Sequence, residues 1–341
     1  MCLRRGLWAR RQTTHIHYGF FGAPTPDRLD RWRHYRDQQL DPSRRRCDHA
    51  RVAALDRHVG GRAPADAVDS IELPLAQYYR AHGLRVVFTV DPTDGLNRAA
   101  EAPELVAAGR SITDTMVQRL YREWVFAVAQ KIQPDYLGLA AETNLIRAAA
   151  PATVYQAVVT MTNAVAAQIH AASLPSKLYV SIQVETAWGR LSSPPGPYQG
   201  IAQDLADFPF VEALGLSSYP YLAGFADPDA IPLDYYSRIA SGTMLPLLVV
   251  EGGWPSVSVG TIVSSPEKQA RYLARQELLL DSAKATGLFQ LTFYDIDLSN
   301  NPPPPGSILP LFTHLGLADS AMHAKPALAM WDSMFHRVRE P

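Results

Sequence analysis

Two glutamates each follow an apolar run of the kind that forms a buried strand. Glu142 ends the run DYLGLAAE (135–142), and Glu251 lies between PLLVV and GGWPS in the stretch 246–256. Two carboxyl groups that flank one glycosidic bond can cleave it, because the protonated one assists the leaving oxygen while the ionised one attacks or activates water. A separation of about 5–5.5 Å would give retention of configuration, and about 6.5–9.5 Å would give inversion.

Aromatic and polar side chains lie near the ends of the same runs. The rings of Tyr219, Tyr221, Trp254 and Tyr294 could stack on the C–H faces of a sugar. Tyr219 could also donate a hydrogen bond to Glu251 and so fix its orientation. Each of these side chains could instead be a packing or ion-paired residue at a strand end. The predicted substrate-binding residues are Asn144, Gln183, Glu185, Tyr219, Tyr221, Trp254, Tyr294 and Asp295.

The elements that would position these residues alternate along the chain. From about residue 70, apolar strand-like runs alternate with helical patterns, which is typical of a parallel sheet covered by helices. A further strand is expected at HIHYGFFG (15–22), and an eighth would close a (β/α)8 barrel, in which strand ends meet at one mouth. An open doubly wound sheet is the alternative, but no Gly-rich phosphate turn follows the first strand. The expected strands are 84–92, 135–142, 177–185, 211–220, 246–253 and 288–297, and the expected helices are 114–132, 151–172, 200–207, 233–241, 265–287 and 326–337.

The place of the second barrel strand, about residues 23–68, has no apolar run and is rich in arginine. We therefore expect this region of the barrel to be irregular or defective. It could be a surface insertion or a disordered basic arm. The hypothesis we favour is that this part of the reading frame is not the one with which the fold evolved. Residues 1–14 are expected to be a disordered extension, and residues 15–341 a single barrel domain.

Three segments together resemble a known group of enzymes. VVEGGWPS is similar to the strand-seven nucleophile segment of clan A glycoside hydrolases, in particular the plant-type β-1,3-glucanases and the endo-β-1,4-galactanases. YLGLAAETN resembles the strand-four segment with the acid/base, and GLSSYPYL resembles strand six with its tyrosine. The resemblance covers roughly residues 84–297. It implies a (β/α)8 barrel and a retaining glycosidase in which Glu142 is the acid/base and Glu251 the nucleophile.

Two other functions stay open. Clan A members usually have Asn directly before the acid/base, whereas this chain has Ala141, so a carbohydrate-binding barrel with lapsed activity is one alternative. The other is a metal-dependent barrel hydrolase, suggested by His15 and His17 on the first expected strand. That class also needs histidines after the fifth and sixth strands, where this chain has Glu185 and Tyr219. We therefore expect no metal and no cofactor.

Composition limits the partners. The chain has 341 residues, 47% of them hydrophobic, which is enough for a large core. The net charge of -1 gives no electrostatic reason to expect nucleic acid or an anionic membrane as a partner. Two cysteines provide no disulfide framework. We expect a monomer that binds an oligo- or polysaccharide. The location stays open, because the opening residues lack a signal-peptide apolar segment although the resembled families are usually exported.

Overall fold

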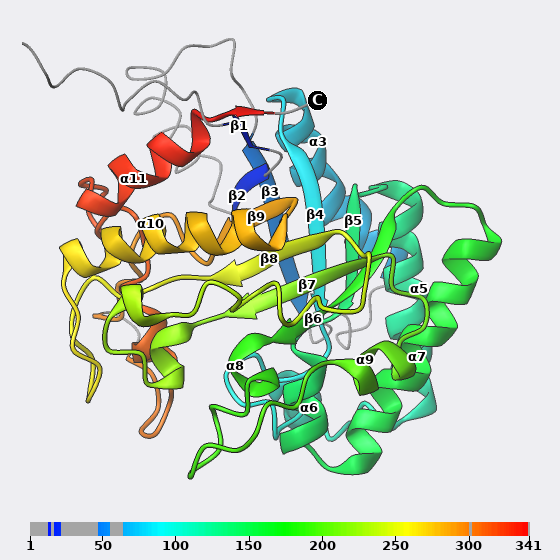
Figure 1. Ribbon diagram of the computed structural model, residues 1–341. Helices are drawn as coiled ribbons and strands as arrows, with labels where there is room; N and C mark the ends of the chain where they lie inside the picture. Colours follow the sequence, from blue (N-terminus) through cyan, green and yellow to red (C-terminus); the bar gives the residue numbers. More distant parts are fainter. Residues whose placement is uncertain (1–12, 15–16, 22–46, 55–63, 300–301, 340–341) are drawn as a thin grey trace, which may run out of the picture.

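The computed structural model describes residues 13–14, 17–21, 47–54, 64–299 and 302–339. Its main sheet is parallel, with the strands paired in chain order from β2 to β9 and with β9 paired back to β2 (Figure 1). The parallel α/β architecture that the sequence predicts is confirmed. The strands are β2 (His17–Phe21), β3 (Cys47–Ala54), β4 (Arg85–Asp91), β5 (Tyr136–Ala140), β6 (Lys177–Gln183), β7 (Ala213–Ser218), β8 (Leu247–Gly252) and β9 (Gly287–Gln290).

A strand lies within the region 23–68, where the sequence shows no apolar run. Residues Cys47–Ala54 pair with β2 on one side and along the whole of β4 on the other, from Asp48 opposite Arg85 to Ala54 opposite Asp91. The expectation that this stretch contains no strand is therefore wrong at β3. Backbone pairing with β2 and β4 places the strand there. Residues 22–46 and 55–63, on which the rest of that prediction falls, lie outside the described residues.

The two ends of the described chain meet. Residues Thr13–Thr14 form β1, which pairs in parallel with β10 (Val338–Arg339). The predicted disordered extension, 1–14, therefore ends in two residues with regular pairing. Residues 1–12 lie outside the described part.

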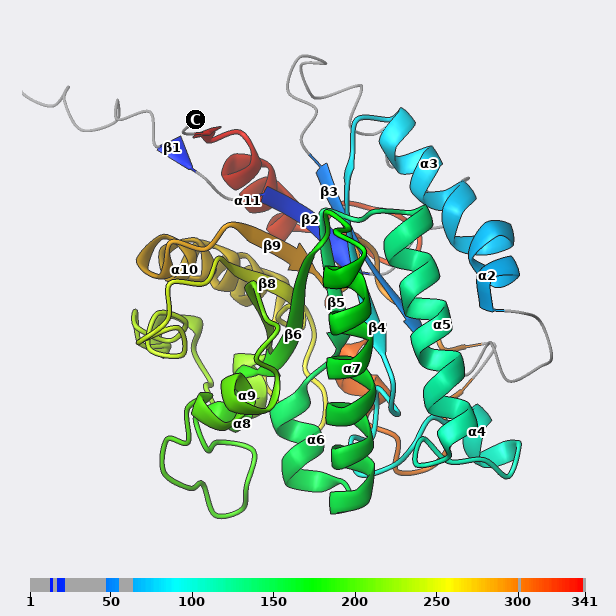
Figure 2. The ribbon, with the colours of Figure 1, turned by 90° about the vertical axis from the view of Figure 1, so that its right-hand side faces the viewer.

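Helices cover the outside of the sheet. Helices α5 (Thr115–Lys131) and α7 (Ala152–Ala171) run side by side over β4, β5 and β6, and α10 (Pro266–Ala283) and α11 (Pro326–Phe335) cover β8 and β9 (Figures 1 and 2). Two apolar cores lie between these helices and the strands. No helix in the described part of the chain is both long and apolar enough to cross a membrane. The shorter elements are α2 (Pro64–Ala67), η3 (Val68–Glu72), α3 (Leu73–Ala81), α4 (Pro103–Ala107), α6 (Thr143–Ala149), α8 (Val184–Ala187), α9 (Ala202–Asp207), η4 (Pro220–Ala223), η5 (Pro228–Ala230) and η6 (Leu309–Phe312).

A third core fills the inside of the ring of strands, and Tyr179 of β6 lies at its centre. The Tyr179 ring lies so close to β5 and β7 that a Cβ at Gly138 or Gly215 would come within 2.6 or 2.8 Å of it. Its hydroxyl is 2.5 Å from the Thr89 hydroxyl of β4. The two glycines thus make room for one large ring, which closes the floor below the strand ends.

One predicted helix is absent. Residues 233–241 form consecutive turns, in which some backbone N–H groups bond to the i−3 carbonyl and others to the i−4 carbonyl. The buried side chains of Tyr235, Tyr236 and Ile239 pack into the core from this turn. Packing of these side chains outweighs a helical pattern only nine residues long, because so short a segment has little intrinsic helical stability.

Candidate active site

The two glutamates of interest end two strands on well-separated parts of the sheet. Glu251 is the penultimate residue of β8. Glu142 follows β5 by two residues and precedes α6, and its backbone is left-handed, with φ 49° and ψ 48°. A non-glycine residue in this region is strained and common at functional sites. The Glu142 backbone N–H donates to Ser181 Oγ of β6 at 2.9 Å, which helps to hold this turn.

A bulge aims Glu251 inward. The ladder between β7 and β8 pairs Leu216 with Val249 and then Ser217 with Glu251, which leaves Val250 as an extra residue. Val250 packs in the core inside the ring of strands. On a regular strand the next side chain would point outward, but the bulge restores the inward direction for Glu251. Its partner Ser217 also points inward, because its hydroxyl reaches Glu142.

Glu142 is buried and accepts two side-chain hydrogen bonds. Ser217 Oγ donates to its Oε1 at 2.7 Å, and Arg98 Nε donates to its Oε2 at 2.9 Å. Arg98 comes from the loop after β4 and also forms an ion pair with Asp91, with Nη1 to Oδ1 at 2.6 Å. The same Nη1 donates to Thr93 Oγ1 at 3.0 Å. The guanidinium therefore links the end of β4 to the turn that carries Glu142.

This arrangement keeps Arg98 charged. Burial by itself would lower the pKa of Arg98, but the carboxylates of Asp91 and Glu142 outweigh it and raise that pKa above its usual value. Arg98 is therefore a positive charge placed between the carboxyl groups of Asp91 and Glu142.

Glu251 has a different environment. The Tyr219 hydroxyl donates to its Oε1, as the sequence led us to expect. Burial, followed by the negative charge of Glu142, raises the pKa of Glu251 to about 8. The hydrogen bond from Tyr219 and the charge of Arg98 oppose this rise only in part. The burial of Glu251 and the charge of Glu142 therefore both favour the protonated form of Glu251.

The two carboxyl groups form a coupled pair. The charge of Glu142 raises the pKa of Glu251, so the ionisation of Glu251 depends on that of Glu142. A pair of this kind can supply one general acid and one anion, which are the two groups that acyl and glycosyl transfer require.

Three of the predicted substrate-binding residues are bonded to the protein itself. Asn144 joins α6 to the end of β6, since its amide donates to the Gln183 carbonyl and accepts from the Gln183 N–H, both at 2.9 Å. The Gln183 side chain accepts from the Thr186 N–H and donates to Glu185. Glu185 is fully buried. These three side chains hold the end of β6 in place rather than facing a ligand.

The aromatic residues also differ from expectation. Trp254 is only 1% exposed, stacks on Tyr272 and donates its indole N–H to Ser264 Oγ at 3.0 Å. This packing leaves no open face for a sugar, so the predicted stacking surface at Trp254 is corrected. Tyr221 is buried as well, and its hydroxyl donates to the Leu311 carbonyl. Tyr294 remains partly exposed.

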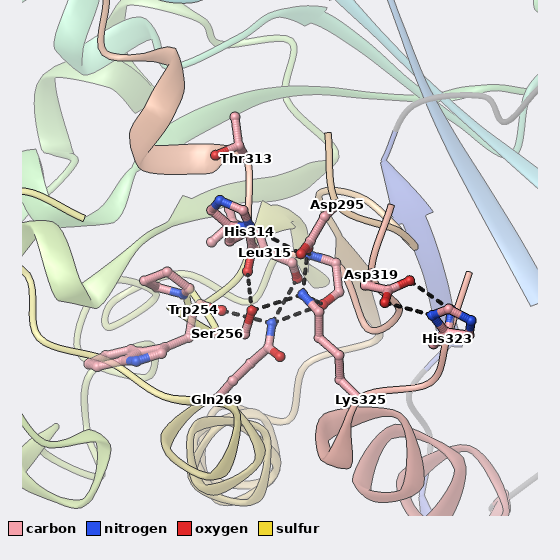
Figure 3. A network of polar contacts seen from close by, with 12 residues as sticks. Trp254, Ser256, Gln269, Asp295, Thr313, His314, Leu315, Asp319, His323 and Lys325 are labelled. Carbon is pink, nitrogen blue, oxygen red and sulfur yellow. Dashed lines mark hydrogen bonds and ion pairs between the residues drawn. The ribbon is translucent and has the colours of Figure 1, made fainter. Parts of the chain in front are cut away.

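Asp295 belongs to a structural network (Figure 3). Lys325 Nζ contacts its Oδ1 at 2.5 Å, His314 Nδ1 lies 3.2 Å from its Oδ2, and the Gly316 N–H donates to it. Lys325 also donates to Ser256 Oγ at 2.8 Å. Asp295 therefore ties the segments after β8 and β9 to the chain before α11, and its carboxylate is already satisfied. Its predicted contact with substrate stays a prediction.

Arg98 and Ser217 belong to the site although the sequence did not predict them. Ser217 falls in SSYP at the end of β7, next to the predicted Tyr219, so its position at a strand end was the available signal. Arg98 lies in a loop after β4 with no pattern that distinguishes it from other arginines. Within the described residues, no three His, Cys, Asp or Glu side chains are grouped to hold a metal ion. His15, one of the two histidines considered for a metal, lies outside that part.

The fold is one that glycoside hydrolases use. The chain is similar to a GH5_18 protein from Bifidobacterium longum subsp. infantis, with a TM-score of 0.62 and 14% identity over 96% of this chain and 80% of the other. It is also similar to an exo-β-1,4-mannosidase from Opitutaceae bacterium strain TAV5, with a TM-score of 0.61 and 15% identity over 95% of this chain. A third similar structure is a family 39 glycoside hydrolase from Bacteroides cellulosilyticus WH2, with a TM-score of 0.58 and 15% identity over 93% of this chain.

At identities of 14% and 15% these similarities show the fold alone. The chain spans 60% of the mannosidase and 62% of the family 39 enzyme. No protein-family model and no curated protein matches the chain.

Proposed function

We propose that this protein is a retaining glycoside hydrolase that cleaves a β-linked glycan. The observation that carries the proposal is that Glu142 and Glu251, at the ends of β5 and β8, are both hydrogen-bonded from the end of β7, Glu142 by Ser217 and Glu251 by Tyr219. The charge of Glu142 also raises the pKa of Glu251. The resemblance of VVEGGWPS and YLGLAAETN to clan A segments and the glycosidase fold of the similar structures support it. No metal or cofactor takes part in the proposed reaction.

In the proposed mechanism the Glu251 carboxylate attacks the anomeric carbon while Glu142 gives its proton to the leaving oxygen. A glycosyl ester on Glu251 results. Glu142, now an anion, then takes a proton from water, whose oxygen attacks the anomeric carbon and releases Glu251. Ser217 and Arg98 would orient Glu142 in both steps, and Tyr219 would orient Glu251.

The raised pKa of Glu251 has a consequence for this mechanism. Attack on the anomeric carbon needs the Glu251 carboxylate, whereas burial and the charge of Glu142 favour the protonated form of Glu251. In the reactive form the proton is on Glu142, from which it passes to the leaving oxygen.

Several wider assignments form part of the same proposal. Residues 15–341 would be one catalytic domain, a complete (β/α)8 barrel of the clan A type, with an oligo- or polysaccharide as its partner. The mannosidase among the similar structures makes aryl β-mannosides a first choice beside glucosides and galactosides.

The test uses Glu251→Ala and Glu142→Ala, with the exposed Glu123→Ala on α5 as the matched control. Neither site variant should hydrolyse an aryl β-glycoside at the rate of the parent protein. Azide should rescue Glu251→Ala and give the α-glycosyl azide, whereas with a dinitrophenyl glycoside it should rescue Glu142→Ala and give the β-glycosyl azide. If Glu251→Ala gives the β-glycosyl azide and Glu142→Ala the α-glycosyl azide, Glu142 is the nucleophile and Glu251 the acid/base. Full activity in Glu251→Ala would refute the proposal.

A carbohydrate-binding barrel without turnover is the second candidate. The observation in its favour is that Asn144, Gln183 and Glu185 all bond to the protein, and that Ala141 precedes Glu142 in place of the asparagine usual in clan A. If calorimetry shows that the protein binds a glycan but none of the aryl β-mannosides, glucosides and galactosides is hydrolysed, this second function is favoured over the first.

A further inference from the structure

Glu185 is a buried acid that the proposed reaction does not use. It lies in the first turn of α8, directly after β6, and is 0% exposed. A carboxyl group so far from water is costly unless hydrogen bonds compensate for the lost solvation. Because Glu185 lies next to the strand ends, its hydrogen-bond partners show which parts of the site it holds in place.

All side-chain partners of Glu185 are neutral donors. Its Oε1 accepts from the Tyr219 N–H at 3.0 Å, from the Tyr235 hydroxyl at 3.0 Å and from Ser218 Oγ at 3.2 Å. Its Oε2 accepts from Gln183 Nε2 at 2.5 Å. In the described ranges, no Lys, Arg or His forms an ion pair with it. Four donors on one carboxylate hold the end of β6 against the end of β7.

The contact with Tyr219 connects Glu185 to the pair of catalytic acids. Tyr219 follows β7, and the chain turns there into η4. Glu185 binds the backbone of Tyr219, while the side chain of the same residue donates to Glu251. The Tyr219 ring also packs edge-on against Tyr221 and Phe312, so the ring has little freedom of its own. The position of its hydroxyl therefore depends on the backbone that Glu185 holds.

We propose that Glu185 is a positioning residue of this site, which fixes the backbone at Ser218 and Tyr219 and thereby aims the Tyr219 hydroxyl at Glu251. The inference rests on the proposed function only for its kinetic consequence. The chain of contacts from Glu185 through Tyr219 to Glu251 is a property of the folded protein. Glu185 itself touches neither the substrate nor the reacting atoms.

The acid also titrates in the neutral range. Burial raises the pKa of Glu185 to about 7, although the bonds from Tyr219, Tyr235 and Ser218 oppose the rise. Above that pH the anion binds its donors strongly, and below it a proton weakens the hold on Tyr219. The titratable groups that face Glu185 are the phenols of Tyr221, Tyr235, Tyr236 and Tyr272, and Arg190 acts on Tyr235 nearby.

The experiment compares Glu185→Gln, Tyr219→Phe and the double variant, with Glu123→Gln as a matched control on the outer surface. The pKa of Glu251 is measured by carbon-13 NMR of glutamate-labelled protein, and kcat and KM are measured with an aryl β-glycoside. Loss of the Tyr219 bond removes a donor that stabilises the anion, so the pKa of Glu251 should rise in both single variants. We expect kcat/KM to fall at least about tenfold, mainly through kcat, since a hydrogen bond to a charged group is lost.

The double variant should be no worse than Tyr219→Phe alone, because both changes remove the same bond. Additive losses, or an unchanged pKa of Glu251 in Glu185→Gln, would overturn the inference. If Glu185→Gln does not fold, Ser218→Ala removes one of its donors and should give the same changes in smaller size. If the parent protein hydrolyses no glycoside, the proposed function fails, but the NMR titration still decides the role of Glu185.

Discussion

Arg98 is the residue whose removal should affect this protein most sharply. Its buried side chain is 6% exposed and forms two ion pairs, with Asp91 at 2.6 Å and with Glu142 at 2.9 Å. Replacing it by methionine keeps most of the packing but leaves two buried carboxylates without their cation. Breaking a buried ion pair in this way costs about 3–5 kcal/mol of the free energy of unfolding. At this chain length that corresponds to a melting temperature lower by about 4–7 °C.

Two further variants separate charge from geometry. Arg98→Lys keeps the positive charge, but one ammonium group cannot reproduce the two directions of the guanidinium, so we expect an intermediate loss. Adding Asp91→Asn to Arg98→Met removes one of the uncompensated charges and should recover part of the stability.

Thermal and urea unfolding at pH 7 measure these effects. Arg119→Met is the control, since Arg119 forms an exposed pair with Glu123 that should contribute less than about 1 kcal/mol. If Arg98→Met melts within a degree of the parent protein, the buried charge network does not hold the ends of β4 and β5 together, and the reasoning is wrong.

The remaining predictions concern the proton on the coupled pair. Because Glu251 has a pKa of about 8, kcat/KM should decline above that pH as the pair loses its last proton. In Glu142→Gln the neighbouring charge is gone, so pH–rate profiles with a dinitrophenyl glycoside should show Glu251 titrating below pH 8. Glu251 also links stability to pH. Its folded pKa lies above the usual value of about 4.3, so between these two values the folded state binds a proton that the unfolded chain releases. The free energy of unfolding should fall as pH rises through this window, by at most about 1.4 kcal/mol per pH unit, and urea titrations should show a flatter dependence in Glu251→Gln.

The strands from β4 to β9 could be predicted from the sequence because each is a short, mainly apolar run. β4, β6, β7 and β8 lie within two residues of their expected bounds. β9 ends at Gln290, well before the expected 297, because the following residues leave the ladder and bond to the segment 313–318. β3 could not be predicted, since backbone pairing with β2 and β4 places it and no side-chain pattern does.

A residue of the candidate site could be predicted only where its position at the end of a strand decides the direction of its side chain. The rule that strand ends face the mouth led to Glu142, Glu251 and Tyr219. It says nothing about Arg98, whose partners meet only when the ends of β4 and β5 come together. It also cannot tell whether a ring faces solvent or core, which is why Trp254, adjacent to the glycines after Glu251, proved to be buried.

Glu251 points into the ring of strands because of a bulge that the sequence pattern does not reveal. Leu248 and Val250 both point into the ring of strands, so regular alternation would send Glu251 outward to the helices. The bulge at Val250 reverses this, and the next residue must then let β8 approach β7 closely. A Cβ at Gly252 would lie 2.7 Å from the Ser218 carbonyl oxygen, so only glycine allows that approach. The first glycine of EGG is thus part of the device that aims the carboxylate, because it lets the bulged strand stay against the strand that carries Ser217 and leads into Tyr219.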